Sequence, residues 1–230
     1  MGGQMNKNIP AYLAEFFATF ALVFFGVGAI MTNHLSGGSL GILGIAAAHA
    51  LALVVMVIVT INISGAHINP AVTFAMLVTR RIGLTAAVGY FCSQMLGAYY
   101  AAWILDFFIP GGLAKAVNFG MPALQNGMSY NGGIILEAVM TFFLVLAIFG
   151  SAVDERGPKL QACFAIGFAV FIDILVGGPF TGAAMNPARA FGPTLLSGNW
   201  ANHSVYWIGP LCGALLAAIV YDGLILRKKS

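Results

Sequence analysis

Charged residues are scarce in this chain. Only 7% of its 230 residues are Asp, Glu, Lys or Arg, whereas a soluble domain carries about 25%. Hydrophobic residues make up 60% of the sequence, and the mean hydropathy is +0.93. Because so few polar groups cannot cover a water-soluble fold, the composition predicts an integral membrane protein with little aqueous mass.

Cysteine is also rare, which argues against two kinds of site. Cys92, Cys163 and Cys212 each lie in an apolar stretch, where we expect small packed side chains rather than a disulfide or metal framework. The basic residues are spread among helix ends rather than gathered in one patch, which excludes a nucleic-acid-binding surface. We assign no catalytic residue, metal or cofactor, and we do not expect an enzyme.

The apolar runs predict an all-α membrane fold of six spans and two half-spans. A helix needs about 20 mostly apolar residues to cross a bilayer, and the first run lacks a signal-peptide cleavage pattern. Two shorter apolar segments would cover only ~16 Å each, about half of the hydrocarbon core, so we expect them to be re-entrant. The spans are 10–31, 40–61, 85–107, 131–152, 160–178 and 204–226, and the half-helices are 69–79 and 186–196.

The basic residues also predict the orientation of the chain. With both termini in the cytoplasm, eight of the ten Lys and Arg residues fall on the cytoplasmic side, in agreement with the positive-inside rule. Lys115 alone falls on the outer side, and Arg189 lies within a membrane segment. The eight residues are Lys7, Arg80, Arg81, Arg156, Lys159, Arg227, Lys228 and Lys229.

The chain repeats itself. Glu15 matches Glu137 in one pair of similar segments, and Gly97 matches Gly213 in another. Each half has three spans, which is an odd number, so the halves should have opposite topology and place their functional site at the midplane between them. The repeats are about 10–107 and 131–226, and an outer loop, 108–130, joins them within a single channel domain of residues 1–230.

One motif occurs once in each half. The sequence SGAHINPAVTFA begins at Ser64, and TGAAMNPARAFG begins at Thr181. Asn69 and Asn186 are placed to cap the two half-helices, and the proline after each suits the first helical position. Two helix N-termini that meet in mid-membrane present partial positive charge, to which the asparagine amides add donors. Because irregular backbone at this depth requires surrounding protein or a water-filled cavity, the motif predicts a pore that interrupts proton transfer and repels cations.

Other polar residues in the spans are expected to serve this pore. Arg189 follows the second motif's asparagine by three residues, and an arginine at that depth is costly and by default functional. His49 lies at a similar depth in the second span, so we place it in the pore, although it could instead be a packed core residue. Glu15 and Glu137 occupy equivalent positions, so we expect them to accept hydrogen bonds from the backbone of the re-entrant loops.

Together these residues resemble the aquaporin, or major intrinsic protein, family over essentially the whole chain. The resemblance implies six tilted helices and two half-helices, one pore in each subunit of a homotetramer, and passive flow of water. It also implies an outer selectivity filter of four positions, which correspond to His49, Ile174, Ala183 and Arg189. The backbone carbonyls that would line the pore are those of Gly65, Ala66, His67, Gly182, Ala183 and Ala184.

The filter is similar to that of plant tonoplast intrinsic proteins, as is the stretch 177–182. A histidine in the second span facing isoleucine implies a wider constriction than that of orthodox water channels, with room for ammonia, hydrogen peroxide or urea. Asn118 is a candidate for a further filter position in the outer loop. Asp173 stands where members of that subfamily usually have Asn, so their selectivity does not transfer simply to this chain.

Two alternatives accompany the expectation of a water channel. Glycerol facilitators typically carry Asp directly after the filter arginine, where this chain has Ala190. Ion-coupled secondary transporters also use inverted repeats and broken helices, and Asp173 would have to supply the ion site. We expect a channel in the lipid bilayer with both termini cytoplasmic, in a plasma or inner membrane rather than a vacuolar one.

Overall fold

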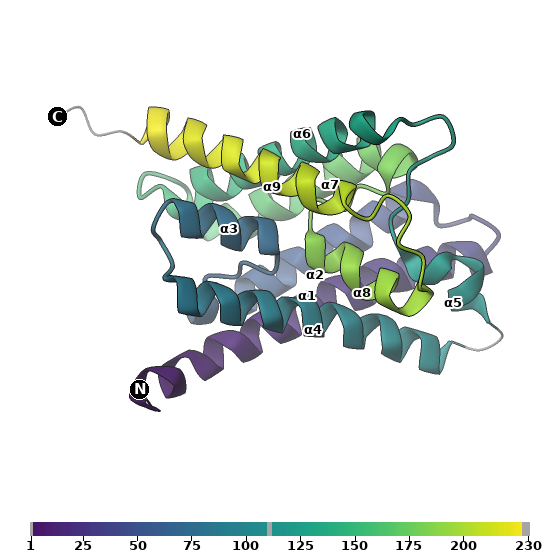
Figure 1. Cartoon of the computed structure of the whole chain (residues 1–230), viewed down its shortest axis with the longest axis horizontal. Coiled ribbons are helices and arrows are strands. Elements are labelled where there is room, and N and C mark those ends of the chain that lie inside the picture. The colour runs from purple at the N-terminus through teal and green to yellow at the C-terminus, as the bar shows by residue number, and fades with distance from the viewer. Residues whose placement is uncertain (1, 110–111, 227–230) are drawn as a thin grey trace.

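The computed structural model describes residues 2–109 and 112–226, and of residues 2–7 it describes the backbone alone. Long helices form a bundle around two short ones, and the described residues contain no strand (Figure 1). The first half contains α1 (Gly2–Leu35), α2 (Gly41–Ser64), α3 (Pro70–Val78) and α4 (Leu84–Phe108). The connection and the second half contain α5 (Leu113–Ala116), η1 (Asn118–Gly120), α6 (Tyr130–Ile148), η2 (Phe149–Val153), η3 (Lys159–Gln161), α7 (Ala162–Thr181), α8 (Pro187–Ser197), α9 (Val205–Ala218) and η4 (Ile219–Ile225).

Six helices have the length of a membrane span. Within the described residues, five helical stretches are both long and apolar enough to cross a bilayer, and they contain α1, α2, α6, α7 and α9. The sixth, α4, has 25 residues, but Gln94, Asp106 and three tyrosines lower its hydropathy. Because α4 runs along the bundle beside α1 (Figure 1), it is the span that the sequence predicts over 85–107.

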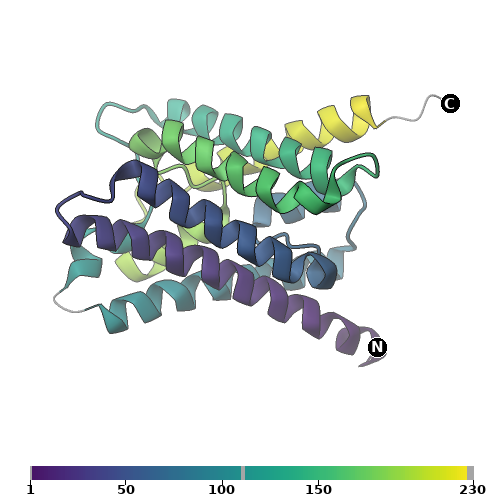
Figure 2. The same ribbon diagram turned by 180° about the vertical axis from the view of Figure 1, so that it is seen from behind.

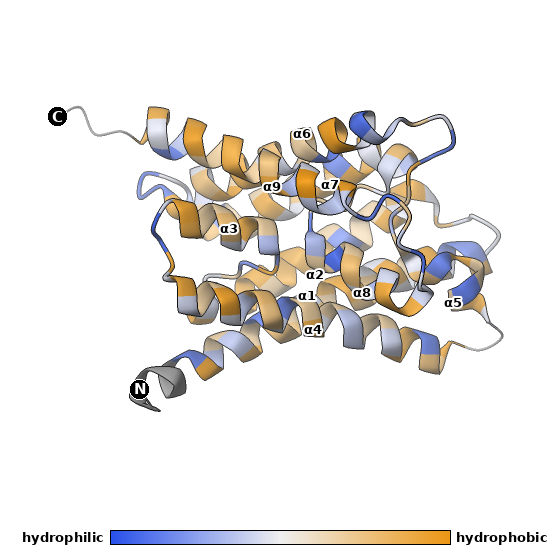
Figure 3. Ribbon diagram, in the orientation of Figure 1, coloured by the Kyte–Doolittle hydropathy of each residue, from blue (hydrophilic) through white to orange (hydrophobic). Residues whose placement is uncertain are grey.

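The bundle is apolar outside and holds polar side chains inside. Phe17, Leu51 and Phe143 are 57%, 61% and 52% exposed, and hydrophobic residues dominate the long helices while hydrophilic residues gather in the loops (Figure 3). Glu15 and Glu137 are both completely buried. This distribution is the reverse of that in a soluble protein, because lipid rather than water surrounds the helices.

Glycine lets helices cross closely at the same place in each half. The chain packs α1 against α4 in the first half and α6 against α9 in the second. A Cβ atom on Gly97 would lie 2.3 Å from the carbonyl oxygen of Phe16, and one on Gly213 would lie 2.1 Å from that of Ala138. Small residues permit this direct backbone contact between membrane helices, which explains why the two glycines match in the sequence.

The two short helices lie end to end inside the bundle, with their N-termini meeting near its middle (Figure 1). They have 9 residues in α3 and 11 in α8. At ~1.5 Å per residue, each covers about half of a ~30 Å hydrocarbon core. Together they therefore make roughly one discontinuous span, as the two apolar half-segments predict.

Both ends of the described chain lie at the same end of the bundle (Figures 1 and 2). An ion pair of 2.6 Å between Arg81 Nη2 and Asp222 Oδ1 joins two segments there, and a second ion pair of 2.6 Å, between Arg156 Nη2 and Asp154 Oδ2, lies within the loop after η2. The hydrogen bonds from Arg156 hold the pKa of Asp154 well below its usual range. Three of the residues used to predict the orientation, Arg227, Lys228 and Lys229, lie outside the described residues.

The connection between the halves contains more structure than its composition predicts. It includes the short elements α5 and η1, and the last residue of η1, Gly120, has a φ of 67°. Further on, the backbone N–H of Gln125 donates to the carbonyl oxygen of Phe180 at 2.8 Å. The connection is therefore attached to the end of α7, beside the second re-entrant loop.

Candidate functional site

The two re-entrant loops follow the same unusual backbone path. Gly65 and Gly182 end α2 and α7 with φ angles of 85° and 83°. The left-handed region then recurs in residues with side chains, namely Ala66 (54°), Ile68 (59°), Ala183 (43°) and Met185 (51°). Few residues other than glycine adopt these angles, and a β-branched isoleucine does so very rarely. Strain of this kind persists only where surrounding groups enforce it, and it marks functional segments.

Glu15 of α1 is one of the groups that enforce the first loop. Its Oε1 accepts the backbone N–H of His67 at 2.8 Å, and its Oε2 accepts that of Ile68 at 2.6 Å. Ser64 Oγ donates to the same carboxylate at 2.6 Å, and Gln94 Nε2 donates to it at 2.7 Å. Four donors thus satisfy one buried carboxylate, which offsets the cost of its burial.

Glu137 of α6 repeats this arrangement in the second loop. It accepts the backbone N–H groups of Ala184 and Met185 at 2.9 and 2.7 Å, and it accepts the hydroxyl of Thr181 at 2.7 Å. The described residues show no counterpart of Gln94 on this carboxylate. The two glutamates therefore attach each loop to the first helix of its own half.

Further groups support the loops in matching pairs. The backbone N–H groups of Ala66 and Ala183 each donate at 3.1 Å to the hydroxyl that precedes them, on Ser64 and Thr181. In addition, Tyr90 Oη donates to the Ser64 carbonyl at 2.7 Å, and Tyr206 Oη donates to the Thr181 carbonyl at 2.8 Å. Sequence reasoning missed these roles, although the hydroxyl residue that opens both motifs was a signal for the first of them.

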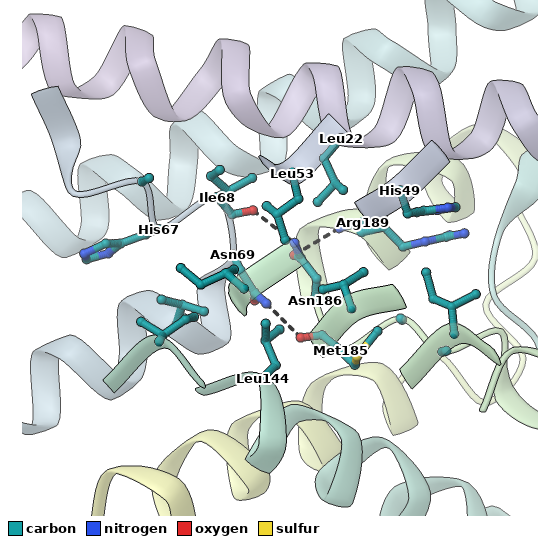
Figure 4. A pocket seen from close by; sticks show the side chains of 18 residues that line it. Leu22, His49, Leu53, His67, Ile68, Asn69, Leu144, Met185, Asn186 and Arg189 are labelled. Atoms are coloured by element: carbon teal, nitrogen blue, oxygen red, sulfur yellow. Dashed lines mark hydrogen bonds between the residues drawn. The ribbon is translucent and has the colours of Figure 1, made fainter. Parts of the chain in front are cut away.

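Asn69 and Asn186 connect the two loops to each other. Asn69 Nδ2 donates to the carbonyl of Met185 at 2.8 Å, and Asn186 Nδ2 donates to the carbonyl of Ile68 at 3.0 Å (Figure 4). Their Oδ1 atoms accept the backbone N–H groups of Ala71 and of Ala188 at 2.8 and 3.0 Å, and so cap α3 and α8. Each amide keeps its second hydrogen available, so both can donate to a solute at the junction.

A narrow cavity passes this junction. It leaves about 30 Å³ for the centres of water molecules, whereas about 10–15 Å³ is enough for one water. Asn69 and Asn186 face it together with residues of both loops. The remaining wall is apolar and comes from Leu22, Leu53, Val72, Leu144, Ile148, Ile166 and Val170. A solute in this cavity can form hydrogen bonds along one side only, which favours passage in single file.

The four expected filter residues meet at one end of the cavity. His49, Ile174, Ala183 and Arg189 all contribute to its lining. Three of them, His49, Ile174 and Arg189, also line an outer cavity of about 250 Å³ that the connection between the halves borders. Arg189 Nη1 donates to the carbonyl of Gly120 at 2.9 Å, a contact that sequence reasoning missed. Arg189 is only 4% exposed, and this hydrogen bond anchors its guanidinium where it borders both cavities.

Two residues expected at the pore, Asn118 and Gly65, lie elsewhere, and so does Asp173, which the sequence left unplaced. Asn118 is exposed and lines neither cavity, and Gly120 from the same segment reaches Arg189 instead. Gly65 lines neither cavity, whereas Ile68 and Met185 of the two re-entrant loops line the inner one. Asp173 lines neither cavity, is 7% exposed, and has an Oδ2 atom without a hydrogen-bond partner in the described part of the chain.

The carbonyls expected to line the pore therefore divide between the two cavities. Residues Ala66, His67, Ala183 and Ala184 border the inner cavity, and Gly182 borders the outer one. His67 also packs within its own loop, where its Nδ1 lies 3.1 Å from Thr73 Oγ1. The site as a whole is a narrow cavity with a mainly apolar wall and a few fixed donors, and no described group in it is arranged as a nucleophile with a base.

Comparison with known proteins agrees with this geometry. The family model described as major intrinsic protein matches residues 4–221. The chain is 44% identical to aquaporin TIP4-4 of Zea mays, with 96% of this chain and 88% of that protein covered. It is 42% identical to probable aquaporin TIP3-2 of Arabidopsis thaliana, with 95% and 85% covered. The X-ray structure of the aquaglyceroporin from Plasmodium falciparum matches with a TM-score of 0.87 and 25% identity, over 94% of this chain and 96% of that one.

Proposed function

Because the chain belongs to the major intrinsic protein family, we propose that it is a passive transmembrane channel for water that excludes protons and ions. The observation that carries this proposal is the junction of α3 and α8, where Asn69 and Asn186 bind each other's loops beside a cavity that leaves only about 30 Å³ for the centres of water molecules. The chain is not an enzyme. It moves solutes down their gradients without chemical change.

Proton exclusion follows from the charges and donors at the junction. The N-termini of α3 and α8 point at the same place, and each carries about half a positive charge. Asn69 and Asn186 each offer one remaining amide hydrogen there. A water that accepts from both has its oxygen turned toward them and its hydrogens turned away, which interrupts a continuous chain of donors. The same positive ends repel cations.

Selectivity among neutral solutes is assigned to His49, Ile174, Ala183 and Arg189. Arg189 donates to a passing solute, while Ile174 and Ala183 limit its width. His49 Nδ1 lies 2.9 Å from the Ile45 carbonyl, so in the neutral ring Nδ1 carries the hydrogen, while Nε2 is buried against Gly26 of α1 and the ring borders the cavity. A small neutral solute that accepts a hydrogen bond from Arg189 fits beside this ring, so ammonia, hydrogen peroxide and urea are proposed beside water. Asn118 is exposed in the connection, and its role as an extra filter position stays a prediction.

A glycerol or small-polyol facilitator is the alternative within the family. The similarity to an aquaglyceroporin favours it, but Ala190 stands where such proteins typically have Asp, and the TIP-type relatives favour water. An ion-coupled transporter has less support, because Asp173, its required ion site, borders neither cavity.

The decisive experiment is stopped-flow light scattering of proteoliposomes after an osmotic step. A water channel shrinks the vesicles much faster than empty liposomes shrink. Gradients of ammonia, urea and glycerol in the same vesicles then define the solute range. Equal shrinkage rates with and without the protein would contradict the proposal. A glycerol flux close to the urea flux would favour the glycerol facilitator.

The proposal extends to assembly, topology and location. We place the chain as one channel domain of two inverted repeats, about 10–107 and 131–226, in a homotetramer with both termini in the cytoplasm. Both ends of the described chain lie at the end of the bundle where α3 is connected to α4, and Arg81 of that connection pairs with Asp222 near the C-terminal end, which supports this orientation. The TIP-type relatives weigh against the plasma or inner membrane expected from the sequence and favour a vacuolar membrane. Light scattering of the purified protein measures its mass, and membrane fractionation locates it.

A further inference from the structure

Gly26 of α1 lies directly against the imidazole of His49. A Cβ atom built on Gly26 would lie 2.3 Å from His49 Nε2, 2.4 Å from its Cδ2 and 2.7 Å from its Cε1. No real Cβ tolerates such distances, so the ring occupies the space that a side chain on α1 would fill. His49 lies between the ribbon of α1 and Arg189 (Figure 4).

A second contact holds the ring in this recess. His49 Nδ1 lies 2.9 Å from the carbonyl of Ile45, one turn earlier on α2. The opposite nitrogen, Nε2, is buried and has no hydrogen-bond partner among the described residues. The imidazole therefore has a hydrogen-bond partner at Nδ1 and none among the described residues at Nε2, and it borders both cavities. Its position across the pore depends on how far it can withdraw toward α1.

We propose that Gly26 is a specificity-determining residue, which sets the width of the constriction by giving the His49 imidazole a recess in α1. The inference rests on the proposed filter role of His49. Gly26 itself touches no solute and acts by positioning the ring. With any larger residue at this position, the ring has to leave α1, and the side opposite α1 is the side of Arg189 and the cavity.

The size of the effect follows from the distances. Restoring an ordinary contact of 3.4 Å from the present 2.3 Å requires a shift of about 1 Å. Overpacking of this kind moves side chains off their preferred positions. In a constriction that passes one water at a time, a shift of about 1 Å obstructs urea more than water, because water is narrower. Gly26 should therefore control the ratio of urea to water permeability rather than permeability as a whole.

The test is Gly26→Ala in proteoliposomes, with urea and water permeability measured on the same vesicles. We expect the urea-to-water ratio to fall about tenfold or more, on the scale of one methyl group in a tight pocket. Gly28→Ala is the matched control on the same helix, because a Cβ there meets only Leu105 Cδ2 at 3.6 Å, an ordinary contact. The urea-to-water permeability ratio of Gly28→Ala should equal that of the unmodified protein.

The double variant Gly26→Ala, His49→Ala separates positioning from general damage to α1. If Gly26 acts through His49, the double variant has the same ratio as His49→Ala alone, because the two changes are not additive when one residue acts through the other. A ratio that falls equally in both backgrounds would overturn the proposal. So would a Gly26→Ala ratio equal to that of Gly28→Ala.

Failure of the proposed function is distinguishable from failure of this inference. If the unmodified protein conducts no water, the channel function itself is wrong. If it conducts water and Gly26→Ala leaves selectivity unchanged, only the role of Gly26 is wrong. Should Gly26→Ala alone not fold, the double variant decides, because folding restored by His49→Ala supports the contact and a double variant that is also unfolded overturns it.

Discussion

Asn69 and Asn186 each donate a hydrogen bond to the backbone carbonyl that immediately precedes the other asparagine. The distances are 2.8 Å to the Met185 carbonyl and 3.0 Å to the Ile68 carbonyl. Each carbonyl belongs to a residue with a left-handed φ angle, so the strained backbone of one loop presents the acceptor that the other loop needs. The two half-helices are thereby joined as one unit, and their positive ends stay in register at the centre of the pore.

Replacing Asn186 with aspartate tests the proposed proton exclusion. Asn186→Asp keeps a good helix cap, because Asp and Asn are comparable at that position. It removes the donor to the Ile68 carbonyl and adds a negative charge where the helix ends are positive. We expect proton and cation flux to rise while a folded protein is retained, as measured with a pH-sensitive dye in liposomes under an imposed potential. Asn69→Asp should raise proton and cation flux in the same way. If neither variant conducts protons or cations, the role of the two asparagines in proton exclusion is contradicted.

Removing Glu137 should unfold the second loop. Glu137→Ala leaves two backbone N–H groups and the Thr181 hydroxyl without their acceptor, and each buried unsatisfied donor costs about 1–3 kcal/mol. We expect a large drop in thermal unfolding temperature and a loss of water permeability, with Glu15→Ala acting similarly on the first loop. Glu155→Ala is the control, because Glu155 is exposed. A stable, active Glu137→Ala would show that the carboxylate is dispensable.

The filter assignment predicts a change in solute range. Arg189→Ala with His49→Ala removes a charged donor and a ring that borders the cavity, and so widens the constriction; urea permeability should rise several-fold and cations should begin to leak. Lys115→Ala removes a positive charge from the exposed connection and should change neither. Urea uptake and proton flux in proteoliposomes give both readings. Urea and proton permeabilities that stay at the level of the unmodified protein would remove these two residues from the filter.

His203 predicts a pH dependence of stability. Its Nε2 lies 3.0 Å from the Trp207 Nε1 that donates to it, and burial lowers the pKa of His203. The folded state thus favours the neutral ring, so this stability is present above the ordinary pKa of about 6.5. It is lost as the pH falls from that value through the lowered pKa of the folded state.

The thermal unfolding temperature should accordingly decline between about pH 7 and pH 5, by a few degrees for each kcal/mol lost. His203→Gln keeps an acceptor but does not titrate in this range, so its unfolding temperature should depend less on pH. Identical pH profiles for the two proteins would show that His203 is not the group responsible.

The membrane class, the six spans, the half-helices and the asparagine caps could all be predicted from the amino-acid sequence. Each of these depends on local properties, such as the length of an apolar run or a proline after a capping residue. The equivalence of Glu15 and Glu137 could also be predicted, because the internal repeat places them at matching positions. Their hydrogen bonds to the loops then follow from the need of a buried carboxylate for donors.

The groups that meet around the cavities, in contrast, could be identified only from the three-dimensional packing of the helices. Arg189 donates to the Gly120 carbonyl, whereas Asn118 of the same connection lines neither cavity. These positions depend on the path of the connection between the halves, and its amino-acid composition does not determine that path. The recess at Gly26 depends likewise on where α1 crosses α2, and a lone glycine in a membrane helix does not reveal what fills its space. Hydrophobic pattern fixes where helices lie along the chain, whereas contacts between them arise from crossing positions and backbone angles that no single segment encodes.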